Sequence, residues 1–553
     1  MHTHARSGRP PSLRLLATAA AAVLIALTLT PATSASAAGT GSVLWSPNLA
    51  TTPNGTGGYP RATTLEFDNS AADTVLATFA KAGTGTPGSL PVYRSTNGGA
   101  SWSALSEIRS ATSGWDIEAP TLFEVPRTIT GLNAGDILAA GTAWKKGDYT
   151  TQKIEVFKST NGGASWQFLS NCTQTSGLPN SWGHGIWEPS FLISSSGNLQ
   201  CFISDERPAN SATNNQKIGH YTSTDGGHTW GSTMTNDVIF PNDASARPGM
   251  QTFAPLPDGR VAMSYELCRD GTNADHACEV YIKFSSDGAN WGAAGDRGTL
   301  VRTSDSRELL HTPYISWSAG GGANGTLMIS GQRVVAGPTG NKTVLAESGT
   351  VLFANKNLGS GDWFEASTPV TVNPTGGYAA GVPSCPGYST PAIPLSGGSS
   401  YVYFAATWLG QGDQCGVRVG IGAVPRATGA VTGPGGKCLD VDTNTSVNGN
   451  RAQLYTCGTA SGQDWSLTAA GTLESLGKCL DVDAQGTANF TKVQIWDCNG
   501  SGAQRWVPQS NGALLNPQSG RCLDDPQGVT TDGTKLQIYD CNGLSTQRWT
   551  LPA

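Results

Sequence analysis

The sequence predicts an all-β protein of two domains, and two observations carry this prediction. Glycine is very frequent, with 71 of 553 residues, while charged residues make up only 13%, a composition typical of strands joined by turns. The chain also contains two sets of internal repeats, whose periods are roughly 65 and roughly 42 residues, and a fixed period marks a repeated structural unit. Each period therefore predicts one domain.

The N-terminus predicts a secretory signal peptide over residues 1–38. Three arginines, Arg6, Arg9 and Arg14, precede the apolar run LLATAAAAVLIALTL, and small residues around Ala37 suit cleavage. A membrane anchor is the alternative, but the run is short for a bilayer span. We therefore expect a secreted, extracellular protein without a membrane partner. The net charge of −6 argues against a nucleic-acid partner.

The first repeat is the motif SxNGGxxW. Its tryptophans lie 64, 64 and 61 residues apart, and its Asn/Asp and Gly residues suit a tight hairpin turn. We expect each tryptophan to pack between sheets. The motif resembles the Asp-box of sialidase-type β-propellers, which is structural and lies away from the active site. The copies are Ser95–Trp102, Ser159–Trp166, Ser223–Trp230 and the shorter Ser285–Trp291.

A second recurrence has the same period and predicts the innermost strand of each propeller blade. Its segments run from a polar or bulky residue into strand formers, and turn signals follow several of them. Six such segments predict a six-bladed β-propeller over residues 39–423. The segments are RATTL from Arg61, EAPTL from Glu118, EPSFL from Glu188, MQTFAPL from Met250, HTPYI from His311 and YSTPAI from Tyr388.

The first residues of the innermost strands should converge at one end of the central channel, although they are far apart in the sequence. This places Arg61, Glu118, Glu188, His311 and Tyr388 around one pocket. For each of them a solvated rim is the alternative.

The hairpins should add further acids to the same rim. Folding the fourth innermost strand back about Asp258 brings Glu266 opposite Met250. Counting residues across the hairpin of the third blade in the same way brings Asp205 beside Glu188. Glycoside hydrolysis needs two carboxyl groups. Tryptophans such as Trp182 and Trp187 offer flat faces for sugar rings.

The second repeat fills the C-terminus. Three copies of the pattern CLD…QxW have tryptophans 41 and 43 residues apart, and each copy has two cysteines 19 residues apart. The copies resemble the ricin-B-type β-trefoil, a carbohydrate-binding module. We assign it residues 433–553, after a linker at 424–432.

Each trefoil copy suggests one sugar pocket, in which an aspartate accepts hydrogen bonds from sugar hydroxyls while an aromatic ring stacks on the sugar. A purely structural role is the alternative. The first copy has Gly458 where the others have asparagine, which suggests a weak pocket. The residues are Asp440 and Tyr455; Asp481, Trp496 and Asn499; and Asp524, Tyr539 and Asn542.

Two enzyme families match parts of the propeller sequence. Arg61 and Tyr388 resemble elements of the sialidases, but the stretch before the first Asp-box has no acid where that family has its catalytic aspartate. Arg247 and Arg333 stand in no recognisable arginine motif. The segments IWEPSF and SYELC look like the two catalytic segments of glycoside hydrolase family 93, the exo-α-1,5-L-arabinanases.

Resemblance to family 93 implies a retaining exo-arabinanase that releases arabinobiose from the non-reducing end of arabinan. Glu188 would be the nucleophile and Glu266 the acid/base, with the two roles open to exchange. Arg61, Glu118, Trp187, His311 and Tyr388 would bind substrate. An exo-sialidase, another hydrolase and a non-catalytic carbohydrate-binding protein stay open as alternatives.

The remaining expectations concern cofactors, assembly and disulfides. No cofactor or metal is expected, the partner is a plant cell-wall polysaccharide, and the protein should be a monomer. Twelve cysteines in a secreted chain predict disulfides between sequence neighbours. The predicted pairs are Cys172–Cys201, Cys268–Cys278 and Cys385–Cys415 in the propeller and Cys438–Cys457, Cys479–Cys498 and Cys522–Cys541 in the trefoil.

Overall fold

The computed structural model describes residues 41–552, apart from 49, 53, 69–72, 84, 182, 208–215, 244, 269–277, 322–323, 339–340, 373–384, 411–413, 426–428, 459, 468–470 and 510. The predicted signal peptide, residues 1–38, and Trp182 lie outside the described residues. Within the described ranges, no helix has the length and apolarity needed to cross a membrane.

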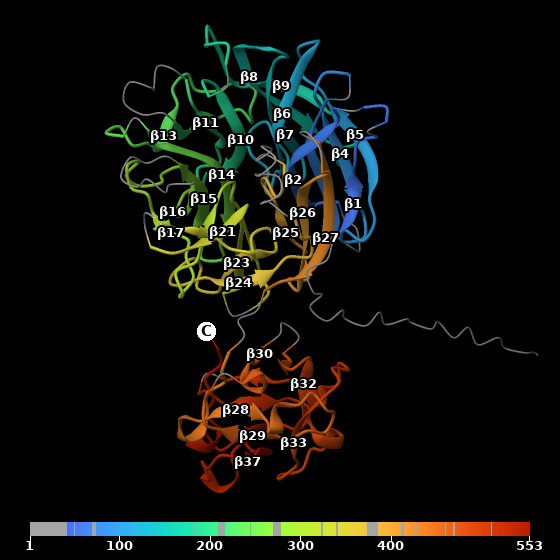
Figure 1. Cartoon of the computed structure of the whole chain (residues 1–553), viewed down its shortest axis with the longest axis vertical. Helices are drawn as coiled ribbons and strands as arrows, with labels where there is room; N and C mark the ends of the chain where they lie inside the picture. Colours follow the sequence, from blue (N-terminus) through green and yellow to red (C-terminus); the bar gives the residue numbers. More distant parts are fainter. Residues whose placement is uncertain are drawn as a thin grey trace, which may run out of the picture. The chain divides into compact units, whose positions relative to one another are not determined.

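The described strands before residue 424 form six antiparallel sheets, and Figure 1 shows them arranged in a ring in chain order. The first three sheets are β2 (Thr56–Leu65), β3 (Thr74–Ala82), β4 (Leu90–Ser95) and β5 (Ser103–Ile108); β6 (Trp115–Glu124), β7 (Ile137–Lys145), β8 (Asp148–Ser159) and β9 (Gln167–Ser176); and β10 (Ile186–Ile193), β11 (Leu199–Asp205), β12 (Lys217–Ser223) and β13 (Thr235–Val238).

The next three sheets depart from this simple pattern. The fourth sheet has seven strands, and the sixth joins the start of the domain to its end. They are β14 (Arg247–Pro255), β15 (Val261–Cys268), β16 (Glu279–Ser285), β17 (Thr299–Leu300), β18 (Glu308–Leu310), β21 (Arg333–Ala336) and β22 (Thr343–Val344); β19 (Tyr314–Ser318), β20 (Thr326–Ser330), β23 (Val351–Asn355) and β24 (Phe364–Ser367); and β1 (Ser42–Trp45), β27 (Cys415–Ala423), β26 (Ser400–Trp408) and β25 (Ala392–Pro394).

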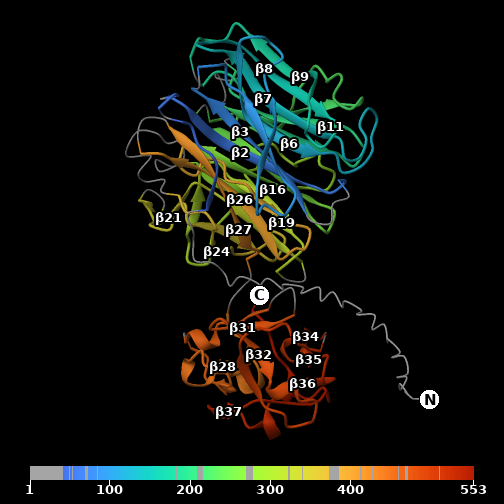
Figure 2. The ribbon, with the colours of Figure 1, turned by 90° about the vertical axis from the view of Figure 1, so that its right-hand side faces the viewer.

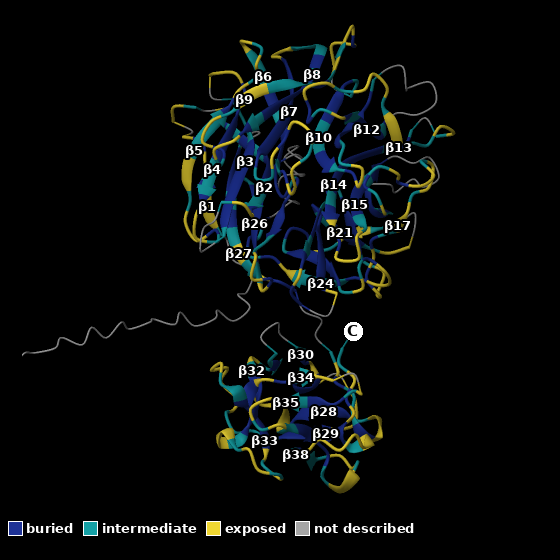
Figure 3. Ribbon diagram, turned by 180° about the vertical axis from the view of Figure 1, so that it is seen from behind, coloured by how far each residue is buried: buried dark blue, intermediate teal, exposed yellow. Residues whose placement is uncertain are grey.

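The innermost strands close a ring. β2 contacts β6, β6 contacts β10, and the series continues through β14, β19 and β25 back to β2; β2 and β6 are seen side by side in Figures 1 and 2. The pairing of β1 with β27, in which Ser42 is opposite Val419, joins the two ends of the domain. Figure 3 shows that the sheets are mostly buried, with exposed residues concentrated in the connections.

The four Asp-box motifs form equivalent turns. In the first, Gly99 N–H donates to Ser95 Oγ at 2.8 Å and Ser101 N–H donates to Asn97 Oδ1 at 2.9 Å, and the other three motifs repeat both bonds. Trp166 Nε1 donates to Ser106 Oγ of the preceding sheet at 3.0 Å. As predicted, this tryptophan packs between sheets.

The innermost strands share a backbone feature that the sequence analysis did not foresee. The register shifts in β2, β6, β10 and β14, and each shift coincides with a non-glycine residue in the left-handed region. In several sheets a proline follows, whose missing N–H cannot join the ladder. The left-handed residues are Tyr59, Ala119, Glu188 and Met250, with His311, Thr312 and Ser389 before β19 and β25.

The C-terminal strands form three further sheets in the described residues. They are β28 (Cys438–Val441), β29 (Ala452–Tyr455) and β37 (Thr534–Lys535); β30 (Ser466–Leu467), β31 (Leu473–Ser475), β32 (Lys478–Val482) and β33 (Val493–Trp496); and β34 (Val507–Pro508), β35 (Leu514–Asn516), β36 (Arg521–Asp524) and β38 (Gln537–Asp540). Short 3₁₀ turns η2 (Pro434–Gly436), η3 (Asp442–Asn444), η4 (Ser461–Gln463), η5 (Asp483–Gln485), η6 (Gly502–Gln504), η7 (Pro526–Gly528) and η8 (Ser545–Gln547) connect them.

The QxW pattern has a physical cause. Trp465, Trp506 and Trp549 meet in one buried core, and their indole N–H groups donate to the carbonyls of Leu439, Leu480 and Leu523 at 2.8, 2.9 and 3.0 Å. The glutamine two residues earlier is also buried, and its side chain bonds the backbone on both sides of the second cysteine. Both residues of the motif are thus needed in every copy.

The structure confirms all six predicted disulfides. It also confirms the all-β fold class. No sheet in the described part of the chain joins strands before Ala423 to strands after Cys438. Within the predicted linker, Val424 packs against the last sheets of the first domain and Val431 against the trefoil core.

The third trefoil copy has a buried carboxylate in place of an apolar core residue. Asp525 occupies the position of Val441 and Val482 and is fully buried, and neither of its carboxylate oxygens has a hydrogen-bond partner among the described residues. Burial, and secondarily the charge of Asp524, raises the pKa of Asp525 to about 6. An unsatisfied buried group of this kind destabilises the fold.

Asp525→Val is therefore expected to stabilise the trefoil by about 1–3 kcal/mol. Because the pKa is higher in the folded chain than the value of about 3.9 expected after unfolding, wild-type stability is lost as pH rises from about 4 to about 6. The gain should therefore be larger at pH 7 than at pH 4, as measured by calorimetric unfolding of the full chain. The converse variant, Val482→Asp, should destabilise the trefoil. An equal stability gain of Asp525→Val at pH 4 and pH 7 would show that the Asp525 carboxylate is not the cause.

Candidate active site

Glu188 lies at the bulge of β10, and this explains its place between a tryptophan and a proline. Trp187 pairs with Ser204 of β11 and Ser190 pairs with Phe202, so Glu188 and Pro189 lie outside the regular ladder. Because Pro189 has no N–H to donate, the strand bulges here, and Glu188 adopts φ 61°. The bulge frees the glutamate from the alternation of a regular strand.

Three hydrogen bonds hold Glu188, two at its carboxylate and one at its backbone carbonyl, and they come from its own sheet and from the next one. Ser204 Oγ donates to Oε2 at 2.5 Å, and the Met250 N–H of β14 donates to the same oxygen at 2.9 Å. Gln251 Nε2 donates to the Glu188 carbonyl at 2.8 Å. Both hydrogen bonds to the carboxylate are thus accepted by Oε2.

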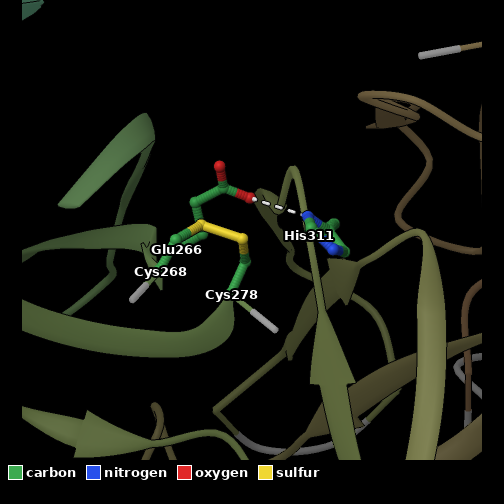
Figure 4. Close-up of side chains that lie close together, drawn as sticks. All are labelled: Glu266, Cys268, Cys278 and His311. Atoms are coloured by element: carbon green, nitrogen blue, oxygen red, sulfur yellow. Dashed lines mark ion pairs between the residues drawn. A yellow bond between two sulfur atoms is a disulfide. The ribbon is translucent and has the colours of Figure 1, made fainter. Parts of the chain in front are cut away.

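Glu266 lies on β15, opposite Gly249 and one residue from the predicted partner Met250. Thr312 N–H donates to its Oε2 at 2.6 Å. His311 Nδ1 lies 3.8 Å from the same oxygen, as Figure 4 shows. Burial, followed by the charge of Arg333, lowers the pKa of His311 to about 4, so the imidazole is neutral near pH 7 and this contact is not an ion pair.

The two glutamates are partly exposed and lie in different electrostatic environments. The pKa of Glu266 is raised to about 8, chiefly by burial and also by the charge of Glu188, while the bond from Thr312 and the charge of Arg247 oppose the shift. Burial also raises the pKa of Glu188, but the bonds from Ser204 and Met250 and the charges of Arg61 and Arg247 oppose this shift. The groups that favour the carboxylate form are thus more numerous around Glu188 than around Glu266.

The predicted alignment of innermost strands needs a correction in the first two sheets. The sequence alignment makes Arg61 and Glu118 equivalent to Glu188. In the structure, the left-handed residues of the first two sheets, equivalent to Glu188, are instead Tyr59 and Ala119. Tyr59 and Ala119 pack with Met250 in one buried cluster, and the Tyr59 pKa responds to the charges of Glu188, Glu266 and Glu118. The phenol of Tyr59 is thus a site residue that the sequence analysis missed, although the recurring X–Pro pair could have indicated it.

Arg61 is buried and braces the centre of the ring. Its guanidinium lies 4.3 Å from the Tyr59 ring centroid and 5.3 Å from that of Tyr314, and it donates to Ser389 Oγ. Tyr388 packs beside Tyr59, with ring centroids 5.9 Å apart. These contacts turn the Arg61 charge toward aromatic rings and a hydroxyl, which does not suit an arginine that must bind the carboxylate of a sialic acid.

The predicted residues Trp187 and Glu118 lie on the innermost strands β10 and β6. Trp187 packs edge-on against Trp144, with centroids 5.7 Å apart, and its Nε1 donates to Glu206 Oε2 at 2.9 Å. Glu206 in turn pairs with Arg247, the arginine whose charge reaches both catalytic candidates. Burial, followed by the charge of Asp116, raises the pKa of Glu118 to about 8.

Asp205 is not beside Glu188, in contrast to the sequence prediction. The register of β10 and β11 pairs it with Ile186, and its fully buried carboxylate bonds Arg207 at 2.7 Å and lies 3.8 Å from Lys217. The residue that reaches Glu188 is Ser204, one position earlier. Because neighbouring strand residues point to opposite faces, the one-residue difference changes the whole role.

Glu266 and three neighbouring side chains have the residue types of a metal site. Glu266, Cys268, Cys278 and His311 place ligand-type atoms within 4.8 Å of one another, and Figure 4 shows their arrangement. The two sulfurs, however, form a disulfide and therefore offer no thiolate to a cation. Only one carboxylate and one imidazole remain of this set.

In the trefoil, the second copy forms a hollow at its predicted sugar position. Asp481, Trp496 and Asn499 line a space of about 310 Å³, and Gln494 Nε2 donates to Asp481 Oδ1 at 3.1 Å. The Trp496 ring is 40% exposed, which suits stacking on a sugar.

The other two trefoil copies differ from the second. In the third, Phe490 packs against Tyr539 with centroids 5.3 Å apart, while Gln537 Nε2 donates to Asp524 at 2.9 Å and Asn542 N–H donates to Gln547 Oε1. In the first, Tyr455 is exposed and Gln453 holds Asp440, but Gly458 provides no side chain.

Comparison with solved structures identifies relatives of the propeller. A Penicillium chrysogenum α-L-arabinanase complexed with arabinobiose is 26% identical, with a TM-score of 0.57, and the match covers 70% of this chain and 98% of that one. A family 93 α-L-arabinofuranosidase of Fusarium graminearum with arabinobiose is 22% identical, with a TM-score of 0.56, over 69% of this chain and 97% of that one.

The resemblance to family 93 is confirmed. The likeness to these hydrolases supports a glycosidase. Residues 427–549 match the family model of the ricin-type β-trefoil lectin domain, which confirms the predicted fold of the second domain. No curated protein sequence matches the chain.

The trefoil geometry predicts unequal sites. Trp496→Ala should weaken adsorption to insoluble polysaccharide by about tenfold, because stacking contributes roughly 0.5–1.5 kcal/mol beyond area burial, and Tyr539→Ala should also weaken it. Tyr455→Ala, in the copy without the asparagine, is the matched control and should have less effect. Depletion assays measure adsorption, and hydrolysis of short soluble substrates should stay near wild type; parallel loss of both would show that the trefoil takes part in catalysis.

Proposed function

We propose that the protein is a secreted, retaining exo-α-1,5-L-arabinanase that releases arabinobiose from the non-reducing end of arabinan. The observation that carries the proposal is the pair Glu188 and Glu266: two partly exposed carboxyl groups on adjacent sheets, coupled through their charges and held by different hydrogen bonds. The arabinobiose complexes of the structural relatives support the choice of sugar. The predicted signal peptide and the six disulfides support secretion.

Glu188 acts as the nucleophile in this proposal. Its Oε2 accepts hydrogen bonds from Ser204 and Met250, so we assign Oε1 to the attack on the anomeric carbon. Glu266, protonated near pH 7, gives its proton to the leaving oxygen. A covalent arabinosyl-enzyme on Glu188 results.

The same electrostatics favour the second step. Once Glu188 is esterified, its negative charge is gone, and with it the contribution that raises the pKa of Glu266. Glu266 then loses its proton more readily and can accept one from the attacking water. One residue thus serves first as acid and then as base, because its neighbour changes charge.

The rest of the site and the trefoil have supporting roles. His311 is neutral and partly exposed beside Glu266, which suits a hydrogen bond to a sugar hydroxyl. Tyr388, Trp187 and Glu118 complete the proposed substrate contacts. The trefoil would hold the enzyme on the polysaccharide and raise the local substrate concentration.

Product analysis tests the proposed function. Linear α-1,5-arabinan should yield arabinobiose, with sialyl-lactose as the control that an exo-sialidase would cleave. The anomer formed first, followed by NMR, should be the retained one, which requires carboxyl groups about 5–5.5 Å apart rather than the roughly 6.5–9.5 Å of an inverting pair. Cleavage of sialyl-lactose alone would refute the arabinanase activity. Formation of the inverted anomer would refute the retaining mechanism.

Removing either glutamate should abolish turnover while the fold stays intact. Glu188→Ala and Glu266→Ala are each expected to lower kcat on linear arabinan by about 10³-fold or more. Azide should partly restore Glu188→Ala, because a small anion can enter the space left by the carboxylate. Asp205→Asn is the control for a nearby buried acid outside the mechanism; retention of more than about a tenth of wild-type kcat by Glu188→Ala would refute the two-glutamate mechanism.

The pH profile should reflect the raised pKa of Glu266. Because the free enzyme needs Glu266 protonated, kcat/KM is expected to fall as pH rises through about 8. Ser204→Ala removes a bond that lowers the pKa of Glu188, so its acid limb should move to higher pH while the alkaline limb stays. A wild-type alkaline limb near pH 5 would show that another group is the acid.

A further inference from the structure

One of the six disulfides lies beside the proposed acid/base. The sulfurs of Cys268 and Cys278, a carboxylate oxygen of Glu266 and a ring nitrogen of His311 lie within 4.8 Å of one another, and Figure 4 shows the S–S bond next to the Glu266 side chain. Both cysteines are 8% exposed. The disulfide therefore forms part of the immediate surroundings of Glu266.

Covalent and hydrogen bonds link these groups in a closed cycle. Cys268 ends β15, two residues after Glu266, and is bonded to Cys278. The Cys278 carbonyl accepts a hydrogen bond from the His311 N–H at 2.9 Å. The next residue, Thr312, donates its N–H to Glu266 Oε2 at 2.6 Å, and the cycle returns to its starting point.

Three residues of the cycle have left-handed backbones: Cys278 with φ 68°, His311 with φ 64° and Thr312 with φ 48°. Non-glycine residues disfavour this region, so the surrounding structure must hold them there. At Cys278 the disulfide provides this restraint. A relaxed Cys278 would turn its carbonyl away from His311 and release the segment that carries the Thr312 N–H.

Chain-entropy stabilisation is smaller for this disulfide than for the other five. Strands β15 and β16 already pair from Val261 with Ser285 to Leu267 with Glu279. The cysteines are separated by 10 residues, against 19 to 30 for the other five pairs, and chain-entropy stabilisation is smallest for short loops. Its position beside Glu266 is the feature that needs explaining.

We propose that the Cys268–Cys278 disulfide is a positioning device for the general acid, acting on Glu266 through His311 and Thr312. The inference deepens the proposed function and rests on it. Neither cysteine touches the reacting atoms, so both are positioning residues. Loss of the disulfide should impair proton transfer to the leaving group while leaving the nucleophile Glu188, held from Ser204 and Met250, in place.

The double variant Cys268→Ala/Cys278→Ala tests this with two substrates. With an arabinan oligosaccharide, whose sugar leaving group needs a proton, kcat/KM should fall about 10- to 100-fold, a part of what general acid catalysis contributes. With a nitrophenyl arabinobioside, whose leaving group departs without a proton, kcat/KM should change less than about threefold, because it reports only the steps up to formation of the arabinosyl-enzyme and not the later step in which Glu266 acts as base. The matched control, Cys172→Ala/Cys201→Ala, removes another propeller disulfide and should leave the ratio of the two rates at its wild-type value.

A second variant separates positioning from folding. Glycine adopts left-handed φ without strain, so Cys268→Ala/Cys278→Gly should regain part of the lost turnover on the oligosaccharide. Because the Thr312 bond lowers the pKa of Glu266, the alkaline limb of kcat/KM should move to higher pH in the alanine variant and return toward wild type in the glycine variant.

The outcomes distinguish failure of the positioning role from failure of the proposed function. Equal losses on both substrates, or an unshifted alkaline limb, would overturn the positioning role while leaving the proposed function standing. If the wild-type chain cleaves neither substrate, the proposed function itself fails. Circular dichroism of each variant verifies that the comparison is made between folded proteins.

Discussion

Closure of the ring by the pairing of β1 with β27 constrains everything else in the first domain. The two strands come from opposite ends of the domain, with Ser42 opposite Val419, and their pairing fixes where the innermost strands meet. Only because these strands contact one another around a closed circle do Glu188 of β10 and Glu266 of β15 come within reach of each other's charge. The Asp-box turns, with tryptophans bonded to the preceding sheet, hold the outer side of the same ring.

The centre of the ring concentrates backbone strain and buried charge in one place. Left-handed residues recur at the same point of successive sheets, and such strain persists only where surrounding packing imposes it. Its consequence is chemical, because the bulges allow side chains and N–H groups to face the centre together. Glu188 is held by the Met250 N–H and Glu266 by the Thr312 N–H, so left-handed residues of one sheet bind the carboxylates of the sheet before.

The trefoil shows how a threefold repeat tolerates change at some positions and not at others. The buried tryptophans and glutamines of the QxW pattern are retained in each copy because their hydrogen bonds build the core. The surface positions diverge, with Gly458 against Asn499 and Asn542, and the core itself admits one exception, Asp525. These differences separate the part of the repeat that folds from the part that binds.

Much of this architecture was determined by the sequence alone. Period and spacing were enough to predict the all-β class, the two domains, the six disulfides and the convergence of Glu188 and Glu266, because repeated units and neighbouring cysteines leave a direct mark on the chain. Tertiary structure decided which of two nearby residues on a strand reaches the site. Ser204 rather than Asp205 reaches Glu188, and Tyr59 rather than Arg61 occupies the left-handed position, because register and bulges depend on pairing between strands. The cycle from Cys268 to Thr312 and the raised pKa of Glu266 also required the fold, since both arise from groups that are far apart in the sequence.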